Sequence, residues 1–387
     1  MTAEPAGQEV PILWRGRRVR AFVPTLLADR DLQLDTHTVV RTATAAAELG
    51  HAATELGAHD YEPLARLLLR AEGVASSYIE GVRAPVVDIV LAEQDPRPHP
   101  GAAAWVAANL AAVSDAVASS ATTALSVELL CQWHRVLMTG SPAAQRYVGA
   151  LRDEQGWIGG HDPTDAHLVT PPPELVPGLL GDLVRFANLD DVDPVAQAAT
   201  VHAQFEVIHP FADGNGRIGR VLAAWVLARK LSLVVPPPIS AAIASDVGGY
   251  GAGLTLFRLG DHNNWICWFA DTVRRAGEAQ GSLIAEVDAL KHRWRERLGA
   301  RSGRSLRRDA AAWQILDLLP RHLILTTQAV TAELGLTNKA AKSALDQLAE
   351  ANIVLEYGTT GSGKRGRPST LYVSTELLGL AGSNPLR

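Results

Sequence analysis

The stretch His209-Pro210-Phe211-Ala212-Asp213-Gly214-Asn215-Gly216-Arg217-Ile218-Gly219-Arg220 lies between two apolar segments and organises the rest of the chain. Upstream, residues 195–208 place apolar side chains at three- to four-residue spacing, which predicts a helix. Downstream, residues 218–231 are rich in Val, Leu, Ala and Trp, which predicts a second, largely buried helix. The sequence therefore predicts two buried helices joined by a glycine-containing turn.

The turn between these helices has the composition of an anion site. Gly214 and Gly216 permit a tight turn whose backbone N–H groups point at one spot, and the following helix directs the positive end of its dipole there. Arg217 and Arg220 are three residues apart on that helix and therefore lie on one face. Their guanidinium groups are suited to phosphate oxygens, so the turn is predicted to bind more than one phosphate group.

Two further side chains in the stretch add chemistry to this anion site. Asp213 offers a hard oxygen ligand beside the phosphates, which suits Mg²⁺. His209 is the only group in the stretch that accepts a proton near neutral pH. A simple corner between packed helices does not require His, Asp, Asn and two Arg around three glycines. We therefore interpret the stretch as catalytic.

The stretch also resembles the signature His-x-Phe-x-Asp-Gly-Asn-Gly-Arg-x-x-Arg of the Fic family, and every specified position matches. In that family a helical domain transfers AMP from ATP to a hydroxyl side chain of a target protein and releases pyrophosphate. The resemblance implies that His209 deprotonates the target hydroxyl, that Asp213 binds Mg²⁺ and that Phe211 belongs to the core. The ATP-binding residues that it implies in this stretch are Gly214, Asn215, Gly216, Arg217, Gly219 and Arg220.

A second segment resembles the inhibitory motif Ser/Thr-x-x-x-Glu-Gly/Asn of Fic proteins that carry an inhibitor helix before the catalytic core. Residues 61–80 predict a helix that ends with Ser76, Glu80 and the glycine C-cap Gly81. Glu80 lies at the negative end of this helix dipole, where it needs a cation or remains in water. The resemblance implies that Glu80 pairs with Arg220 and blocks the seat of the ATP γ-phosphate.

A long turn-rich segment, residues 140–173, contains two short extended runs, which predicts a β-hairpin. The family resemblance implies a flap here that binds the backbone of the target by strand addition. The implied flap residues are Ala166, His167, Leu168 and Val169. Tyr250 resembles the tyrosine that lines the adenine pocket in the family, although Gly251 stands where a second tyrosine is common.

Three other histidines fall outside these roles. The seven-residue spacing of His202 and His209 is not a zinc motif, so we interpret His202 as a core residue. His134 lies on another predicted core helix and receives the same interpretation. His167 is expected in solvent on the flap, so none of the three is predicted to act as a second base.

Both ends of the chain lie outside the Fic resemblance, which covers about residues 36–275. Residues 1–35 are expected to be irregular, with an arginine-rich patch that forms a solvated arm. Residues 276–308 are interpreted as a basic helical linker. Residues 309–377 predict three helices and a hairpin, which resembles a winged helix-turn-helix. Three basic residues are expected on its wing, where phosphate contacts are made: Lys364, Arg365 and Arg367.

Composition limits the class of protein. A chain of 387 residues is long enough for two or three domains, and a formal net charge of −5 argues against a surface that grips nucleic acid throughout. Two distant cysteines exclude a zinc ribbon or a disulfide scaffold. The N-terminus lacks a signal pattern, and no run of about eighteen apolar residues occurs. We therefore expect a cytoplasmic protein that has no membrane partner.

These observations predict a mainly α fold, with a Fic-type helical bundle, a β-hairpin flap and a small C-terminal winged-helix domain of α+β class. The predicted domains are 1–100 with the inhibitory helix, the catalytic core 101–275, the linker 276–308 and the winged helix 309–377. The expected activity is AMP transfer from ATP, with Mg²⁺, to a Ser, Thr or Tyr hydroxyl of a target protein. Whether the chain itself is a target is left open.

Several alternatives stay open at the level of sequence. One is a DNA-binding regulator with a nucleotide-sensing Fic core. Others are a Fic enzyme that removes AMP and a Fic enzyme that transfers another phosphate-containing group. DNA as a partner of the winged helix, and a homodimer, are also left open.

Overall fold

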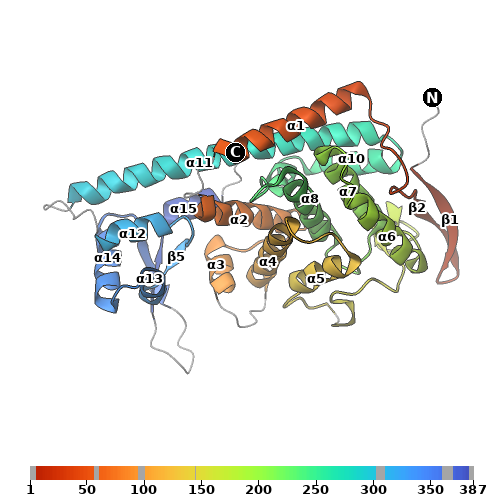
Figure 1. Ribbon diagram of the computed structural model, residues 1–387. Coiled ribbons are helices and arrows are strands. Elements are labelled where there is room, and N and C mark those ends of the chain that lie inside the picture. The colour runs from red at the N-terminus through yellow and green to blue at the C-terminus, as the bar shows by residue number, and fades with distance from the viewer. Residues whose placement is uncertain are drawn as a thin grey trace.

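A computed structural model of this chain describes residues 6–55, 61–94, 101–143, 145–301, 310–359 and 369–382. The fold is mainly helical, as predicted, and its helices surround two large hydrophobic cores (Figure 1). The helices of the first part are α1 (Thr36–Glu55), α2 (Tyr61–Ile79), α3 (Val86–Gln94), α4 (Ala102–Ser120), α5 (Val127–Leu137), α6 (Val176–Ala187), α7 (Pro194–Ile208) and α8 (Asn215–Leu231). The later helices are α9 (Ile239–Ala244), α10 (Val247–Arg258), α11 (His262–Arg301), α12 (Ala311–Leu318), α13 (Thr327–Leu334), α14 (Asn338–Glu350) and α15 (Thr375–Gly382).

The strands form three small antiparallel sheets. Their bounds are β1 (Gly7–Trp14), β2 (Arg17–Pro24), β3 (Trp157–Ile158), β4 (Leu168–Val169), β5 (Ile324–Leu325), β6 (Leu355–Thr359) and β7 (Thr370–Val373). β1 pairs with β2, β3 pairs with β4, and the third sheet has the order β5-β7-β6. Each sheet is too small to form a core of its own, so the helices supply the packing.

Helices α7 and α8 form the centre of the larger core. Every residue of α7 from Val195 to Ile208 is buried, and so is every residue of α8 from Arg217 to Ala228. A helix that is buried on all sides has no solvent face and is stable only when other elements enclose it. Helices α1, α4, α6 and α11 do so here, and large side chains such as Trp133, Phe205 and Trp265 fill the space between them.

Helix α11 is 40 residues long and connects the two cores. Figure 1 shows it running along the molecule from α1 to the C-terminal helices. Its second half buries Leu283, Val287, Leu290 and Trp294 in the C-terminal core, at helical spacing. The predicted division between core and linker at residues 275–276 therefore falls inside a continuous helix, because an apolar stripe persists through the basic segment.

The C-terminal core contains α12, β5, α13, α14, β6 and β7 in chain order, so three helices precede a hairpin as expected. The strand β5 and the helix α15 were not foreseen. On α14, Lys342 contacts the carboxylates of Asp346 and Glu356, which neutralises part of its charge. The predicted wing residues Lys364, Arg365 and Arg367 lie outside the described residues. The winged-helix interpretation and its DNA contacts therefore stay predictions.

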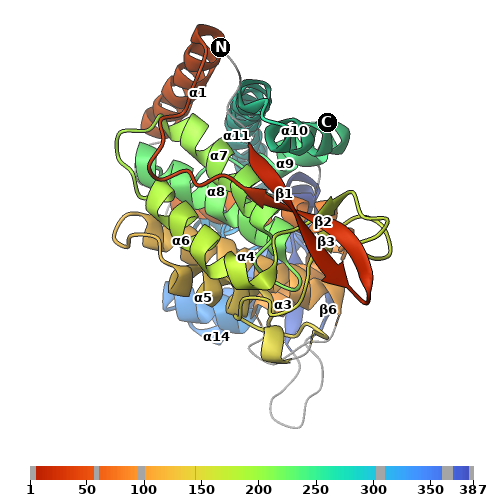
Figure 2. The same cartoon turned by 90° about the vertical axis from the view of Figure 1, so that its right-hand side faces the viewer.

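The prediction of an irregular N-terminal arm is wrong. β1 and β2 form a hairpin in which Trp14 pairs with Arg17, and the two residues between them adopt left-handed backbone, with φ of 47° at Arg15 and 80° at Gly16. Such a two-residue turn matches the twist of the flanking strands. Figure 2 shows the hairpin beside β3, and its Trp14 ring contacts that of Trp157 at 6.3 Å between centroids.

Helix α4 is, among the described helices, the one long and apolar enough to cross a membrane by length and composition. In this fold it packs against α2, α3, α5 and α8. Its buried residues include Val106, Leu110 and Val113, which contribute to the hydrophobic cores. Length and composition alone therefore do not distinguish this core helix from a spanning one.

Candidate active site

The turn between α7 and α8 has two left-handed residues. His209 ends α7 with φ 49° and ψ 62°, and its N–H donates to the carbonyl of Phe205. Gly214 begins α8 with φ 76°, and a Cβ at this position would approach Leu137 to 2.9 Å. Left-handed backbone is unfavourable for a residue other than glycine, so the fold holds His209 in a strained conformation directly beside the helix start.

Asn215 fixes the shape of this turn. Its side-chain oxygen accepts from the N–H of Phe211 at 2.8 Å, and its amide nitrogen donates to the carbonyl of Phe211 at 2.8 Å. The ring of Phe211 is buried and stacks on His134, with centroids 3.9 Å apart. Both polar groups of Asn215 are thus used inside the loop, and the phosphate contact expected of this residue is left to its backbone N–H.

His134 is the buried core histidine that was predicted, and it also supports the turn. Its Nε2 lies 3.0 Å from the carbonyl oxygen of Asp213, and its Nδ1 accepts from the N–H of Gly149 at 2.9 Å. Burial lowers the pKa of His134 to about 4, so the ring is neutral near pH 7. This pairing requires a hydrogen on Nε2, and the ring therefore holds the backbone next to Asp213.

His209 has the geometry of a proton acceptor. Its Nδ1 lies 3.3 Å from the carbonyl oxygen of Glu206, which favours a hydrogen on Nδ1 and a free lone pair on Nε2. Burial lowers the pKa of His209 to about 4, and the nearby charge of Arg152 acts in the same direction. The imidazole is therefore neutral near pH 7 and able to take a proton.

The N-terminal end of α8 faces the same region with unsatisfied donors. The first hydrogen bond of the helix runs from the N–H of Ile218 to the carbonyl of Gly214, so the preceding N–H groups point out of the helix end. Arg217 is buried, its Nε lacks a hydrogen-bond partner, and its Nη2 lies 3.8 Å from Asp213. Amide dipoles and a buried guanidinium together make this end electropositive.

Arg220 lies deeper in the same end and contacts the end of α2. Its Nε donates to the hydroxyl of Ser76 at 3.0 Å, and its Nη2 donates to the carbonyl of Ser76 at 2.9 Å and to Glu80 Oε1 at 2.8 Å. The expected contact between Glu80 and Arg220 is therefore present. Gly81 has φ 76° after the helix, in keeping with its role as a C-cap.

Gly216 lets Glu80 reach the start of α8. A Cβ on Gly216 would lie 2.2 Å from Glu80 Oε1, so only a glycine leaves room for that carboxylate. The carboxylate occupies the end of the helix where the dipole and the amides favour an anion. One oxygen of Glu80 therefore stands where a phosphate oxygen would otherwise be attracted.

A buried polar cluster lies behind Arg220 and involves residues that were assigned to ATP. A Cβ on Gly219 would lie 2.4 Å from Glu206 Oε1, so Gly219 permits close packing of α8 on α7. Tyr250 is buried, its hydroxyl pairs with His202 Nε2 at 2.9 Å, and its ring packs near Trp265. The structure thus places Gly219 and Tyr250 in the core next to Arg220, and their contact with ATP stays a prediction.

Glu206 is the least expected member of this cluster. It is buried, and its Oε1 has no hydrogen-bond partner. Burial raises the pKa of Glu206 to about 8, although the charge of Arg220 opposes the rise. His202, also buried, has its pKa lowered by burial to about 3, as expected for a core histidine. The side chain of Glu206 is therefore largely protonated near pH 7.

The predicted flap is a hairpin of β3 and β4. The N–H of His167 donates to the carbonyl of Ile158 at 3.0 Å, and Leu168 and Val169 pair with β3. The side chain of His167 is exposed, as predicted, and Ala166 precedes the strand. Arg152, which sequence reasoning missed, donates from Nε to the carbonyl of His209 at 2.8 Å.

Asp213 is the residue that the sequence predicts as the Mg²⁺ ligand. Its side chain is 63% exposed at the mouth of the turn, and its Oδ1 accepts from the N–H of Gly214 at 2.6 Å. No group of three or more His, Cys, Asp or Glu suited to a metal occurs among the described residues. One exposed carboxylate fits Mg²⁺ that takes its other ligands from water and phosphates.

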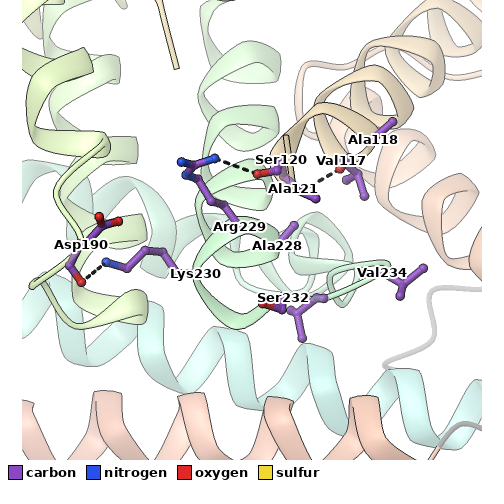
Figure 3. A pocket seen from close by; sticks show the side chains of 11 residues that line it. Val117, Ala118, Ser120, Ala121, Asp190, Ala228, Arg229, Lys230, Ser232 and Val234 are labelled. Carbon is purple, nitrogen blue, oxygen red and sulfur yellow. Dashed lines mark hydrogen bonds between the residues drawn. The ribbon is translucent and has the colours of Figure 1, made fainter. Parts of the chain in front are cut away.

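The opposite end of α8 contains a separate pocket of about 680 Å³ (Figure 3). Arg229 donates to the carbonyl of Ser120 at 3.0 Å, and Lys230 donates to the carbonyl of Asp190 at 2.8 Å. Both cations are thus engaged by backbone oxygens of neighbouring segments. None of the predicted site residues lines this pocket.

Comparison with known proteins agrees with this geometry. Residues 124–227, which include α7, the turn and most of α8, match the Fic/DOC family. Over 170 residues the chain is 26% identical to protein adenylyltransferase fic-1 of Caenorhabditis elegans, covering 43% of this chain and 30% of that protein. Over 58 residues it is 47% identical to the probable protein adenylyltransferase aq_aa38 of Aquifex aeolicus (strain VF5). This match covers 15% of this chain and 18% of that protein. The match thus spans less than a third of either relative.

Solved structures show the same fold. A Fic family protein from Desulfovibrio desulfuricans G20 aligns with a TM-score of 0.54 and 21% identity over 89% of this chain and 97% of that chain. Residues 134–508 of Fic-1 from C. elegans align with a TM-score of 0.50 and 18% identity over 63% and 72%. At these identities the likeness concerns the fold alone.

Proposed function

Because this chain contains a Fic/DOC family domain, we propose that it is a protein adenylyltransferase, which transfers AMP from ATP to a hydroxyl side chain of a protein. The proposal depends on one observation: a single turn carries a neutral His209, oriented by the carbonyl of Glu206, and leads into the electropositive end of α8. Transfer from a nucleotide to a hydroxyl requires a base and an anion site, and the turn between α7 and α8 supplies both. The names of the relatives, protein adenylyltransferase, point to the same reaction.

In the proposed reaction the target hydroxyl attacks the α-phosphorus of ATP. His209 Nε2 accepts the hydroxyl proton, the bond from the α-phosphorus to the bridging oxygen breaks, and pyrophosphate leaves. The triphosphate brings negative charge beside His209, which raises the pKa of the imidazole from its low value toward neutrality. Arg217 and the amides of α8 balance the charge on the phosphates.

Mg²⁺ is the metal that suits this site. Asp213 would hold it, and the ion would neutralise phosphate charge during transfer. The carboxylate is exposed and lies 3.8 Å from Arg217, so ligand and cation flank the same turn. The turn itself needs no metal, because Asn215 and His134 already fix its shape.

Inhibition by Glu80 is part of the proposal. Its carboxylate holds Arg220 and lies against Gly216, where an outer phosphate of ATP would be attracted. The Glu80 carboxylate and a phosphate repel each other when both bind Arg220 and the same helix end. Glu80 therefore has to leave this position before the triphosphate binds in the orientation needed for transfer. Removal of AMP from targets and transfer of another phosphate-containing group use the same turn and remain alternative outcomes of the test.

The test compares wild-type, Glu80→Gly and His209→Ala proteins, incubated with Mg²⁺ and ATP labelled at the α-phosphate and then separated on a gel. We expect labelled protein to rise roughly five- to thirtyfold with Glu80→Gly, since the lost contact is worth about 1–2 kcal/mol. With His209→Ala, label is expected to fall by about 10²- to 10⁴-fold while ATP still binds. No label in any of the three proteins would reject AMP transfer from ATP.

A further inference from the structure

Arg152 is a buried arginine outside the signature, and its guanidinium group donates only to backbone carbonyls. It lies between α5 and β3 and is 4% exposed. Nε donates to the carbonyl of His209 at 2.8 Å, and Nη1 donates to that of Glu154 at 2.9 Å. Nη2 donates to the carbonyls of Pro171 at 2.6 Å and Ile208 at 3.3 Å. One side chain therefore makes four hydrogen bonds.

These carbonyls come from two parts of the site. Ile208 and His209 end α7 and carry the proposed base, whereas Glu154 precedes β3 and Pro171 follows β4. The backbone N–H of Arg152 adds a bond to the carbonyl of Pro210 at 2.9 Å. Arg152 thus joins both ends of the flap to the segment that carries His209.

The chemistry of the group suits orientation better than simple stability. Where a buried charged side chain only fills space, an apolar residue of similar volume can replace it with little loss of stability. The planar fork of a guanidinium, in contrast, fixes the directions of several acceptors at once. Burial lowers the pKa of Arg152 to about 10, so the group remains charged near pH 7.

We propose that Arg152 is a positioning residue, which sets the distance between the flap and His209 and so places the hydroxyl of a flap-bound target segment at His209 Nε2. The proposal rests on the proposed function, because it concerns the target of the same transfer. It assigns to one buried side chain the alignment of the flap with the end of α7.

A second consequence distinguishes this role from packing. The charged groups that act on His209 are Arg152, which opposes its protonation, and Glu80 and Asp213, which favour it, together with the carbonyl of Glu206. Replacing Arg152 by a neutral residue therefore raises the pKa of His209, whereas lysine keeps the charge. The acid limb of the pH–rate profile should move upward for Arg152→Gln and remain in place for Arg152→Lys.

The activity experiment uses the full chain with Glu80→Gly as the parent, and adds Arg152→Lys, Arg152→Gln and the control Arg229→Lys. Arg229 also donates to backbone carbonyls, but at the far end of α8 (Figure 3). Self-labelling from α-labelled ATP and the affinity for a non-hydrolysable ATP analogue are measured. We expect labelling to fall about ten- to a hundredfold in both Arg152 variants, with analogue affinity within about twofold of the parent. Arg229→Lys should change neither.

Amide hydrogen exchange over residues 156–170 tests the same link without activity. Exchange should accelerate in both Arg152 variants and not in Arg229→Lys. The reason is that the ends of the flap lose the hydrogen bonds from Arg152 to the carbonyls of Glu154 and Pro171. If the parent protein gives no label, the proposed function fails, and exchange still decides whether Arg152 holds the flap. Unchanged labelling with unchanged exchange in Arg152→Lys and Arg152→Gln would overturn the proposal. So would a failure of both to fold while Arg229→Lys folds, since Arg152 would then be purely structural.

Discussion

The two ends of helix α8 carry similar cations in opposite surroundings. At the C-terminal end, Arg229 donates to the carbonyls of Ser120 and Thr123, and Lys230 donates to those of Leu189 and Asp190. At the N-terminal end, Arg217 and Arg220 are buried, and each keeps one nitrogen without a hydrogen-bond partner. The C-terminal end is thus complete in itself, whereas the N-terminal end is not.

This difference supports the proposed position of the phosphates. Burying a charged donor without a partner costs free energy, so such a group beside a helix N-terminus is a candidate contact for an anionic ligand. The pocket of about 680 Å³ lies at the satisfied end, and the unsatisfied donors lie at the other. The unmet hydrogen-bonding capacity therefore supports the proposed phosphate site at the N-terminal end of α8, whereas the cavity lies at the other end.

The largest expected effect concerns the buried acid behind Arg220. Burial raises the pKa of Glu206 from 4.5 to about 8, so between these pH values the folded protein holds a proton that the unfolded chain releases. Stability is then lost as pH rises through this range. In Glu206→Gln the loss is absent, and the variant should gain about 2–4 kcal/mol relative to wild type between pH 5 and pH 8, measured by urea unfolding.

The matched control for that prediction is Glu278→Gln, because the side chain of Glu278 is largely exposed and accepts from Arg274. This variant gives the baseline effect of replacing an exposed carboxylate by an amide at each pH. A constant difference for Glu206→Gln would mean that Glu206 is ionised in the folded protein and that Arg220 already has a second carboxylate partner. The N-terminal end of α8 would then be satisfied, and the comparison would fail.

The next effect concerns Arg217 at the N-terminal end of α8, where nucleotide binding and protein stability are expected to respond differently to its removal. In the Glu80→Gly background, Arg217→Ala should weaken a non-hydrolysable ATP analogue about ten- to a hundredfold, since hydrogen bonds to charged groups are worth about 1.5–3 kcal/mol. Without nucleotide, its thermal stability should be equal to or above that of the parent, because an under-bonded buried charge is removed. Calorimetric titration and thermal unfolding measure the two quantities.

A smaller effect is expected at the mouth of the same end. Asp213→Asn keeps an oxygen that accepts from the N–H of Gly214 and removes the charge of the proposed metal ligand. We expect about five- to tenfold more Mg²⁺ to be needed for half-maximal self-labelling, which corresponds to about 1 kcal/mol. A titration with Mg²⁺ at saturating ATP decides the point. An unchanged requirement would remove Asp213 from the metal site.

The smallest effect belongs to the satisfied end. Arg229→Ala removes two hydrogen bonds to backbone carbonyls at the protein surface, so we expect a loss of about 0.5–1 kcal/mol in the free energy of unfolding. Binding of the ATP analogue should remain unchanged. If nucleotide affinity fell as far as in Arg217→Ala, the two ends of α8 would not differ in function. The pocket in Figure 3 would then be the better candidate for the nucleotide site.

Local sequence was sufficient for the turn and for most helices. The apolar spacing before His209, the glycines after it and the acid cap at Asp193 act within a few residues, so they specify α7, the turn and α8 without the rest of the chain. The hairpin of the flap and the three helices before β6 follow from turn residues and periodicity in the same way. The partner of Glu80 came from resemblance to a family motif, since no local pattern relates residues 140 positions apart.

Other features depend on which segments meet in space. The N-terminal hairpin turns at Arg15 and Gly16, and this pair of residues is only a weak sequence signal for a hairpin. In the folded protein the hairpin also packs against the flap, through Trp14 and Trp157. Arg152 has no motif of its own, and its four carbonyl partners exist only after α7 and the flap have come together.

The sequence by itself determined the two central helices and the glycine turn, because these rest on residue spacing along one short stretch. It also supplied the proposed base, the proposed metal ligand and the two arginines of the proposed phosphate site, which stay predictions. Only the tertiary structure decided that Asn215 braces the loop, that Gly219 and Tyr250 lie in the core and that Glu206 is buried without a partner. The physical reason is that hydrogen bonding and burial are properties of the surroundings, and those surroundings come from helices and strands far away in the chain.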